Sequence, residues 1–411
     1  MNIAVFSHYF SPEIGAPSAR IHDMARQWVA MGHEVQVVTC FPNHPTGQIY
    51  PGYASCRYSA EVMDSVLVHR NWTYVTPNKG FIKKTLGHAT FWPASYFFTL
   101  PRMKRPDVVI GTSPTFFAAM GAAAAARRFG IPFIMEVRDL WPACFVDLGV
   151  IKNPHIIRLL EQWELYLYRK ADHVVTVTDA FKRNLVKRGV RGEKVTSIPN
   201  GADEIFWKPQ PRSGLLDKAS GGRRGFNVLY IGAHGISQAL TRVLEAAHQL
   251  SDIHDVRFFF VGEGAEKEKL KETAREMGLD RVYFLDPVGK EEVRDCYSDA
   301  DVCLVPLRDI PLFDSFIPSK MFEMLSMECP IVASVTGEAA DILINSGGAV
   351  VVPPEDSLAI ANAIRRLHGE PTMREQMGVR GRAYVAQNYS RSSLAARYLD
   401  VIDSVILNKP Q

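Results

Sequence analysis

The 411-residue sequence has only six cysteines, at positions 40, 56, 144, 296, 303 and 329, and no two of them form a CxxC pair or a close cluster. This spacing argues against a zinc site and against a disulfide framework. The cysteines are therefore expected to be small buried hydrophobic residues of a protein kept in a reducing compartment.

The chain also lacks an excess of charge of either sign. Lys and Arg number 47 against 44 Asp and Glu, a net charge of +3, so no global attraction to nucleic acid is expected and any basic surface must be local. Apolar residues make up 47% and charged residues 22%, which excludes the composition of a disordered chain.

Long apolar runs with the character of membrane spans are scarce. Val108–Ala126 and Thr85–Pro101 carry no charge over 19 and 17 residues, close to the length of about 20 that a transmembrane helix needs. The first contains the turn Gly111-Thr112-Ser113-Pro114 and is interpreted as a buried strand followed by an Ala-rich helix; the second contains His88 and Pro93. A transmembrane helix is the less favoured alternative. No signal peptide is expected at the N-terminus, which favours a cytosolic protein.

What the chain does contain is a repeated order of short apolar run, Gly or Pro turn, and amphipathic helix. This order predicts α/β architecture with parallel sheets covered on both faces. It is interrupted once, between Pro199 and Phe226, where Pro, Gly and charged residues favour an exposed connector. We expect two doubly wound, Rossmann-like domains at 1–200 and 227–388, with a linker at 201–226. The expected strands are Ile3–Ser7, Val35–Thr39, Val108–Gly111, Phe133–Val137, Val174–Thr178, Val195–Ile198, Val228–Ile231, Val256–Val261, Val282–Leu285, Val302–Pro306 and Ile331–Ser334.

Ligands of such folds bind at the carboxyl ends of the strands, so the loops there carry the candidate chemistry. After the first strand, Gly15 lies close to a helix N-terminus and could let the backbone approach a phosphate; a plain turn is the alternative. No GxGxxG occurs, which counts against a dinucleotide dehydrogenase. After the strand ending at Val137, Arg138 and Asp139 form either a site for a substrate proton or sugar hydroxyl, or a structural ion pair.

Three loops of the second half carry similar signals. Gly232-Ala233-His234-Gly235 is a Gly-rich entry to a helix, and His234 could donate to a phosphate oxygen. Gly262-Glu263-Gly264 follows the next strand. In Pro318–Leu325, Lys320 and Glu323 share a helix face, and Glu323 lies in an otherwise apolar run and needs a partner, either a ribose diol or Lys320.

A basic, aromatic segment extends from Tyr74 to Arg105, and no acidic residue occurs between 79 and 106. Basic residues around an aromatic helix suit the interface of an anionic membrane; a core helix with a basic solvated end is the alternative. The residues singled out for membrane or acceptor contact are Lys83, Lys84, Trp92, Phe97 and Arg102.

Taken together, these loops resemble those of the family 4 glycosyltransferases with the GT-B fold, in particular the O-antigen and capsule branch that includes the WbuB-like L-fucosamine transferases. The resemblance covers about residues 1 to 390, in the family's order. It rests on Phe10–Pro17, Glu136–Pro142, Ile198–Asp203, Val261–Gly264 and Pro318–Glu323.

The resemblance implies transfer of a sugar from a nucleotide diphosphate donor, with retention of configuration and no metal cofactor. It implies that Glu323 binds the ribose, Lys320 the diphosphate and Leu285–Val288 the base, and that residues 389–411 form a helix returning to the first domain. The implied catalytic residues are Asp139, Arg138 and Lys320. The implied donor-binding residues are Gly15, Gly232, His234, Gly235, Val288, Arg308, Asp314, Ser315, Phe316, Ile317, Lys320 and Glu323.

The chain departs from the family pattern in three respects. Ser315, next to Asp314, occupies the place of a frequent Glu, and Arg138 occupies the place of a frequent His. Ala233 and Gln238 stand where many relatives have Arg and Lys, which leaves the diphosphate to Lys320, Arg308 or His234.

The resemblance also implies partners: a UDP-sugar donor such as UDP-N-acetyl-L-fucosamine, a polyprenyl diphosphate-linked saccharide acceptor, and the anionic inner face of the plasma membrane, with no nucleic acid. A non-catalytic nucleotide-sugar-binding subunit and a nucleotide-sugar epimerase of the same fold are the alternatives.

Overall fold

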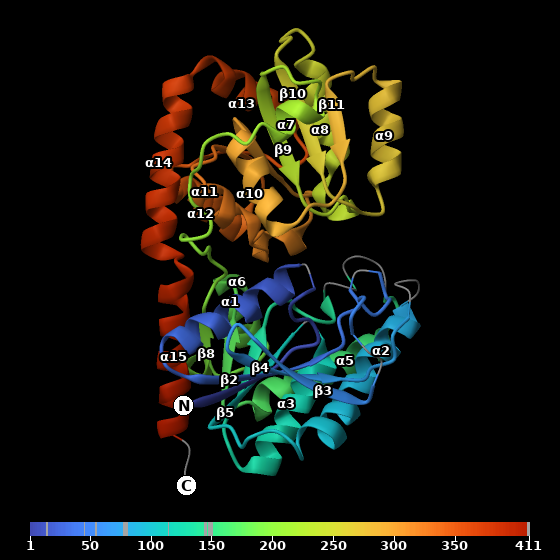
Figure 1. Ribbon diagram of the computed structural model, residues 1–411, viewed down its shortest axis with the longest axis vertical. Helices are drawn as coiled ribbons and strands as arrows, with labels where there is room; N and C mark the ends of the chain where they lie inside the picture. Colours follow the sequence, from blue (N-terminus) through green and yellow to red (C-terminus); the bar gives the residue numbers. More distant parts are fainter. Residues whose placement is uncertain are drawn as a thin grey trace. The chain divides into compact units, whose positions relative to one another are not determined.

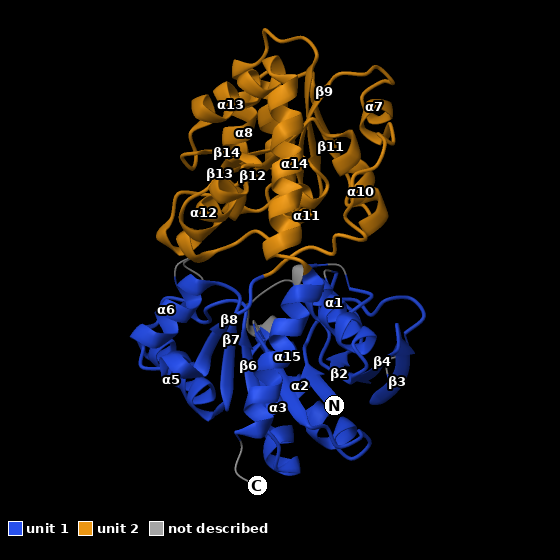
Figure 2. Cartoon of the chain, turned by 90° about the vertical axis from the view of Figure 1, so that its left-hand side faces the viewer, with its two compact units in different colours: residues 1–199, 391–411 blue, residues 200–390 orange. Residues whose placement is uncertain are grey.

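The computed structural model describes residues 1–411 except 14, 45, 54–55, 77–80, 114, 144–145, 147–150 and 409–411. The chain divides into two compact units, residues 1–199 with 391–411 (unit 1) and residues 200–390 (unit 2) (Figure 2). Each unit contains one twisted sheet with helices on both faces, as the alternating pattern predicts (Figure 1).

The sheet of unit 1 has the strand order β3-β4-β2-β1-β5-β6-β7-β8 and is parallel except for the pairing of β3 with β4. Its central strands are buried along their whole length, because helices cover both faces of the sheet. Their sequences therefore show no alternation of apolar and polar residues. The strands are β1 (Asn2–Phe6), β2 (Glu34–Cys40), β3 (Tyr58–Met63), β4 (Val66–Asn71), β5 (Val108–Thr112), β6 (Phe133–Val137), β7 (His173–Thr176) and β8 (Val195–Ser197).

The helices of unit 1 form two layers. Helices α1 and α15 pack together on one face of the sheet, and α3 packs between α2 and α5 on the other, as right-handed crossovers require. The helices are α1 (Ala16–Ala30), α2 (Phe81–Ala94), the π-helical η1 (Ser95–Thr99), α3 (Phe116–Phe129), α5 (Pro154–Lys170), α6 (Asp179–Lys187), the short η2 (Gly192–Lys194) and α15 (Arg391–Leu407).

The two long uncharged stretches become ordinary elements of unit 1. Val108–Ala126 contributes β5 and most of α3. Thr85–Pro101 lies in α2, η1 and the turn that follows η1. Among the residues that the structure describes, no helix combines the length and the apolarity needed to cross a bilayer.

The sequence pattern did not predict the hairpin β3–β4 or the strand β14 (Ala349–Val352). The hairpin turns at Asp64 and Ser65, which both have positive φ (49° and 65°), the conformation of a two-residue type I′ turn. The usual Asn-Gly or Asp-Gly signal of such a turn is absent, and β3 is an exposed edge strand with only a weak alternation.

The sheet of unit 2 is entirely parallel, in the order β11-β10-β9-β12-β13-β14. Its strands are β9 (Phe226–Ile231), β10 (Val256–Val261), β11 (Val282–Leu285), β12 (Val302–Pro306), β13 (Ile331–Ser334) and β14. Its helices are α7 (Leu215–Ala219), η3 (Ile236–Gln238), α8 (Leu240–Gln249), α9 (Lys267–Glu276), α10 (Lys290–Asp299), η4 (Pro311–Ser315), α11 (Lys320–Ser326), α12 (Gly337–Ser346), α13 (Ser357–Gly369) and α14 (Pro371–Asn388).

Residues 201–226 belong to unit 2 and include α7. Buried Asp299 holds this segment, since its carboxylate accepts hydrogen bonds from the Ser213 hydroxyl (2.9 Å) and from the backbone N–H groups of Gly214 (2.9 Å) and Leu216 (3.0 Å).

The chain returns to unit 1 through α15, which confirms the expected return of the last helix. The Trp28 indole donates to the carbonyl oxygen of Ala395 (3.1 Å), and Arg391 forms a buried ion pair with Asp23 (2.7 Å). Leu394, Tyr398 and Ile402 complete the apolar core between α1 and the sheet.

Two glycine loops of unit 2 pack backbone against backbone at the carboxyl ends of β9 and β10. A Cβ on Gly262 would lie 2.0 Å from the carbonyl oxygen of Gly232, and one on Gly264 would lie 2.3 Å from that of His234. Gly262 also has φ +139°, which disfavours any side chain. The glycines in these two loops therefore allow a close approach of the two strand ends.

A buried arginine organises the corresponding edge of unit 1. Arg20 on α1 pairs with Glu136 at the end of β6 (3.0 Å) and donates to the carbonyl oxygens of Ile198 (2.9 Å) and Pro199 (2.8 Å). Glu136 also accepts from the Thr112 hydroxyl (2.9 Å). Arg20 thus fixes the ends of β6 and β8 relative to α1.

We expect Arg20→Ala to lower the free energy of unfolding of unit 1 by about 3–5 kcal/mol, because it leaves the buried Glu136 carboxylate without its charge partner. The matched variant Arg242→Ala removes an exposed pair with Glu245 (2.8 Å) and should cost at most about 0.5 kcal/mol. Urea unfolding followed by circular dichroism compares the two, and equal losses would contradict the role given to Arg20.

We expect Gly262→Ala to destabilise unit 2 more than Gly278→Ala does. Both positions have positive φ, but a Cβ on Gly278 (φ +65°) would meet no atom within 4 Å, so its cost is the backbone strain of about 1–2 kcal/mol. Gly262→Ala adds an overpacking cost of about 1–3 kcal/mol. Thermal unfolding of both variants measures the difference, and equal melting temperatures would show that the two loops can move apart freely.

Candidate active site

Lys320 begins α11 and reaches the carboxyl end of β9. Its ammonium group donates to the carbonyl oxygen of Ile231 (3.0 Å), lies 4.0 Å from the centre of the Tyr230 ring and is 3.1 Å from the position that a Cβ on Gly232 would occupy. Burial lowers the pKa of Lys320 to about 7, against the opposing effects of Cys303 and Glu323. The ammonium group therefore lies beside the Gly232 loop, and it loses its proton near neutral pH.

Glu323 lies one helical turn further along α11. The Tyr297 hydroxyl on α10 donates to its carboxylate at 3.4 Å, and the neighbouring residues Met321, Phe322, Met324 and Leu325 are buried. The apolar run around Glu323 thus forms the core face of the helix, as the sequence indicates. Tyr297 as its partner was not predicted, because Tyr297 is far away in the sequence.

His234 is fully buried behind the Gly232 loop, in contact with the rings of Tyr230 and Phe260. Burial, together with Lys267, lowers its pKa to about 4, so the imidazole is neutral at pH 7. Neither ring nitrogen has a hydrogen-bond partner among the described residues. A direct contact of this imidazole with a ligand would require the side chain to turn outward.

The remaining residues of this loop group are held by their backbones. Gly235 N–H donates to the side-chain oxygen of Gln238 (3.2 Å), and Arg308 N–H donates to the carbonyl oxygen of Ser237 (3.0 Å). The Arg308 side chain follows β12 and is half-buried. Gln238 therefore shapes the turn through its side chain.

The segment before α11 is anchored to α12. Asp314 accepts from the Thr336 hydroxyl (2.5 Å), and its carbonyl oxygen is 2.1 Å from where a Cβ on Gly337 would lie. The next three residues have internal roles: the Ser315 hydroxyl donates to the Leu312 carbonyl oxygen (2.8 Å), while Phe316 and Ile317, like Val288 after β11, pack on the core of unit 2.

In unit 1, Asp139 and Arg138 follow β6 and share one anchor. The Ser113 hydroxyl accepts from the N–H groups of Arg138 (2.7 Å) and Asp139 (3.3 Å), and the Arg138 guanidinium donates to the Pro17 carbonyl oxygen (2.8 Å). Burial raises the pKa of Asp139 to about 6, with Arg138 opposing. A carboxyl with this pKa can accept a hydrogen bond from a sugar hydroxyl and exchange protons near neutral pH.

Near this edge, the loop after β1 leads to Gly15, which has φ +149° and precedes α1. The same loop carries an imidazole and phenol group that sequence reasoning did not single out. The Tyr9 hydroxyl lies 3.2 Å from His88 on α2, and the rings of His8 and His44 contact Tyr9 edge-on. Only the position of Tyr9 at a strand end could have indicated it.

The segment with basic and aromatic residues forms α2 and η1. Lys83 is exposed, Trp92 and Phe97 expose 40% and 66% of their surface, and Arg102 donates to the Phe98 carbonyl oxygen (2.8 Å). The side chain of Lys84 lies outside the described part of the structure. Phe91 and Leu100 are buried, so the aromatic residues divide between the core and the surface.

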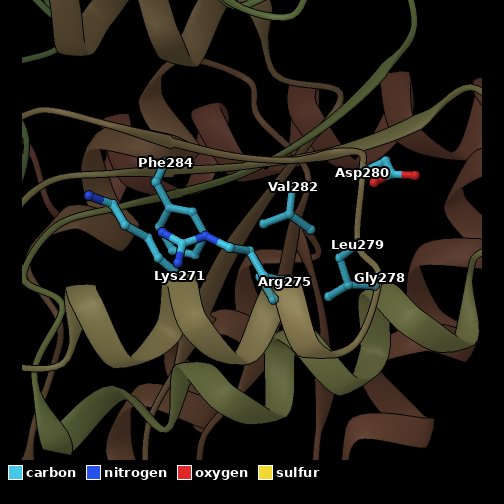
Figure 3. A pocket seen from close by; sticks show the side chains of 8 residues that line it. Lys271, Arg275, Gly278, Leu279, Asp280, Val282 and Phe284 are labelled. Atoms are coloured by element: carbon cyan, nitrogen blue, oxygen red, sulfur yellow. The ribbon is translucent and has the colours of Figure 1, made fainter.

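A pocket of about 350 Å³ lies between α9 and β11, and no predicted site residue lines it. Figure 3 shows Lys271 and Arg275 of α9 on one side and Val282 and Phe284 of β11 on the other.

Across the described ranges, no group of three or more His, Cys, Asp or Glu side chains is arranged to hold a metal ion.

Known proteins resemble the chain over most of its length. A family model described as a glycosyl transferase 4-like domain matches residues 15–201, and one described as glycosyl transferases group 1 matches residues 225–370. WcaI of Escherichia coli K12, named as a colanic acid biosynthesis glycosyl transferase, is 27% identical over 380 residues, 89% of this chain and 92% of WcaI. Glycosyltransferase WbjE of Pseudomonas aeruginosa is 27% identical over 70% of this chain and 72% of its own.

Solved structures share the fold. Sucrose-phosphate synthase from Thermosynechococcus elongatus superposes with a TM-score of 0.76 at 19% identity, covering 99% of this chain and 100% of that one. HepE of Anabaena, solved in complex with UDP-glucose, gives 0.72 at 17% identity over 98% and 100%. Because both halves match models of one enzyme class, the chain belongs to the group 1, family 4 glycosyltransferases, enzymes of the GT-B fold that use nucleotide-sugar donors.

Proposed function

We propose that this chain transfers a sugar from a UDP-sugar, of which UDP-N-acetyl-L-fucosamine is one candidate, to a polyprenyl diphosphate-linked saccharide during surface polysaccharide synthesis. The observation that carries the proposal is the position of Lys320 above the Gly232 loop, one turn from Glu323. Relatives named for colanic acid and lipopolysaccharide core biosynthesis support a role in surface polysaccharide synthesis. HepE, solved with UDP and with UDP-glucose, supports uridine as the nucleoside of the donor.

In the proposed donor site, the diphosphate lies over the Gly232 loop and within reach of the Lys320 ammonium group. Glu323 accepts hydrogen bonds from the ribose hydroxyls, and Leu285–Val288 borders the base. Arg308 is the other charged candidate for contact with the diphosphate, since Ala233 and Gln238 provide no charge there. His234 is neutral at pH 7 and buried, so it contributes only an N–H donor, and only if its side chain turns outward. Asp314, Ser315, Phe316 and Ile317 border the donor sugar. Gly15, which precedes α1, is a candidate for a backbone contact with a phosphate.

The proposed reaction retains the configuration at the anomeric carbon. The bond from that carbon to the diphosphate oxygen breaks as the acceptor oxygen bonds to the same face of the sugar. The acceptor proton passes to the departing diphosphate, so no strong protein base is required. Lys320 stabilises the charge that develops on the diphosphate, which is the main contribution that such a reaction needs from the protein.

The proposed acceptor site lies in unit 1. Asp139, with a pKa near 6, orients an acceptor or donor sugar hydroxyl, and Arg138 supplies a fixed positive charge beside it. Lys83, Lys84, Trp92, Phe97 and Arg102 contact the anionic inner face of the plasma membrane, where the lipid-linked acceptor is embedded. The enzyme then acts at the cytoplasmic surface of that membrane.

We expect Glu323→Ala to weaken UDP binding by about tenfold or more, because a hydrogen bond to a charged group contributes about 1.5–3 kcal/mol. Tyr297→Phe keeps the packing but removes the hydroxyl that orients Glu323, and should give a smaller loss. Glu276→Ala, at the exposed end of α9, is the matched control. Isothermal titration calorimetry with UDP measures all three, and wild-type affinity in Glu323→Ala would rule out the ribose contact.

We expect UDP binding to weaken as the pH rises from 7 to 9. Free Lys320 has a pKa near 7 and loses its proton over this range, whereas a bound diphosphate favours the protonated form, so binding above pH 7 requires proton uptake. The affinity should fall by up to about tenfold per pH unit.

Uridine, which lacks the diphosphate, should show no such fall, and Lys320→Met should bind UDP weakly and independently of pH between 7 and 9. Calorimetry in buffers of different ionisation enthalpy detects the proton directly. A UDP affinity in the wild-type protein that is constant from pH 7 to 9 would contradict the contact between Lys320 and the diphosphate.

A further inference from the structure

Helix α5 of unit 1 carries an exposed apolar stripe that no role described so far uses. Ile156, Leu159, Trp163 and Tyr166 each expose between 47% and 57% of their surface. At 100° per residue their spacing places all four within about 80° on one side of the helix. We call these four residues the α5 stripe.

The α5 stripe is separate from the part of the helix that the core needs. Leu167, Tyr168 and Glu164 are the buried residues of α5, and Glu164 has both carboxylate oxygens occupied, by the hydroxyl of Tyr168 (2.6 Å) and by Arg188 (2.5 Å). The helix is therefore apolar over a wider arc than unit 1 covers. Single exposed apolar residues are normal, but four on one helix face mark an interaction surface.

The helix layer that contains the α5 stripe is mostly basic. Helices α2, α3 and α5 with η1 contain seven basic residues and two acidic ones, Glu161 and the internally paired Glu164. Arg158 and Arg169 are exposed on α5, and the Lys170 ammonium lies 5.7 Å from the centre of the Tyr166 ring. The charged rim of the stripe thus complements an anionic surface.

The layer that contains α5 is continuous with α2. Helix α3 packs against both, on the same face of the sheet, and residues 116–126 of α3 carry no charge (Figure 1). At the end of α3, exposed Arg128 lies 5.9 Å from the centre of the Tyr96 ring of η1. The outer face of this layer therefore has apolar ridges at α2–η1 and at α5, with an uncharged helix between them and basic residues at the ends.

We propose that the α5 stripe is a second membrane anchor, which inserts Ile156, Leu159, Trp163 and Tyr166 into the interface of an anionic lipid bilayer. The inference rests on the proposed function in that the acceptor is lipid-linked. With α2–η1 as the first anchor, two ridges joined by α3 fix the orientation of unit 1 on the bilayer rather than only its distance. A single anchor would leave unit 1 free to rotate about one helix.

The test is flotation of the full chain with vesicles of equal parts phosphatidylglycerol and phosphatidylcholine, and with phosphatidylcholine alone. We expect binding to the anionic vesicles, and a drop of at least about tenfold in the apparent partition coefficient for Leu159→Ser with Trp163→Ser. The control variant Ile344→Ser with Leu358→Ser removes two helical residues of unit 2 that are each 60% exposed, more than Leu159 and Trp163, and should bind as the wild type does. Arg158→Glu with Lys170→Glu should reduce the preference for anionic vesicles, and the basic residues of α2 should maintain the remainder.

A second measurement does not depend on a variant that loses apolar surface. Fluorescence quenching by brominated phosphatidylglycerol should be greater in the wild type than in Trp163→Phe, because Trp163 lies at the depth of the brominated chains. Equal quenching in the two, or vesicle binding by Leu159→Ser with Trp163→Ser at the wild-type level, would overturn the proposal.

Two further outcomes would also overturn it. Sedimentation velocity without lipid could reveal a dimer that the α5 variant dissolves, which would make a second copy the occupant of the stripe. A wild-type chain that binds UDP but no vesicles would remove the anchor while leaving the donor function intact. Conversely, vesicle binding through α5 without UDP binding would contradict the proposed function and leave the anchor standing.

Discussion

The ammonium group of Lys320 is held at the tip of β9 by one carbonyl oxygen and the face of one aromatic ring. These two contacts orient the ammonium group but do not replace the hydration that it would have in water. Burial therefore lowers the pKa of Lys320. The arrangement requires that the chain after β9 has no side chain at Gly232, and that Gly262 lets the neighbouring strand end approach. The position of the Lys320 ammonium group thus depends on the close backbone packing at Gly232 and Gly262.

In unit 1, by contrast, the buried charge of Arg20 is fully paired. Arg20 has a carboxylate and two carbonyl oxygens around it, so its charge is compensated by rigid partners and serves the fold. Asp139, two residues beyond β6, has a raised pKa and is anchored through its backbone N–H rather than its carboxylate. Neighbouring charges at one sheet edge therefore divide into a structural pair and a group that remains available for chemistry.

Much of this organisation was predictable from local pattern, because fully buried parallel strands are continuous apolar runs and the loops after them gather at one edge. The strands around Val5, Ile110 and Phe259 and the placement of Lys320, Glu323 and Asp139 follow from that rule. The hairpin β3–β4 did not, since Asp64-Ser65 is a weak turn signal. The partners Tyr297 and Ser113 and the rotamer that buries His234 were not predictable either. Contacts between distant segments produce no periodic pattern in a sequence.

The return of α15 to unit 1 has a consequence for synthesis of the chain. The core between α1 and the sheet contains Leu394, Tyr398 and Ile402, which emerge only after all of unit 2 has been made. At roughly 5–20 residues per second, translation of residues 200–390 takes on the order of 10–40 s. During that interval Trp28 and its neighbours have no covering helix, so the nascent first unit presents an apolar face that a ribosome-associated chaperone would recognise.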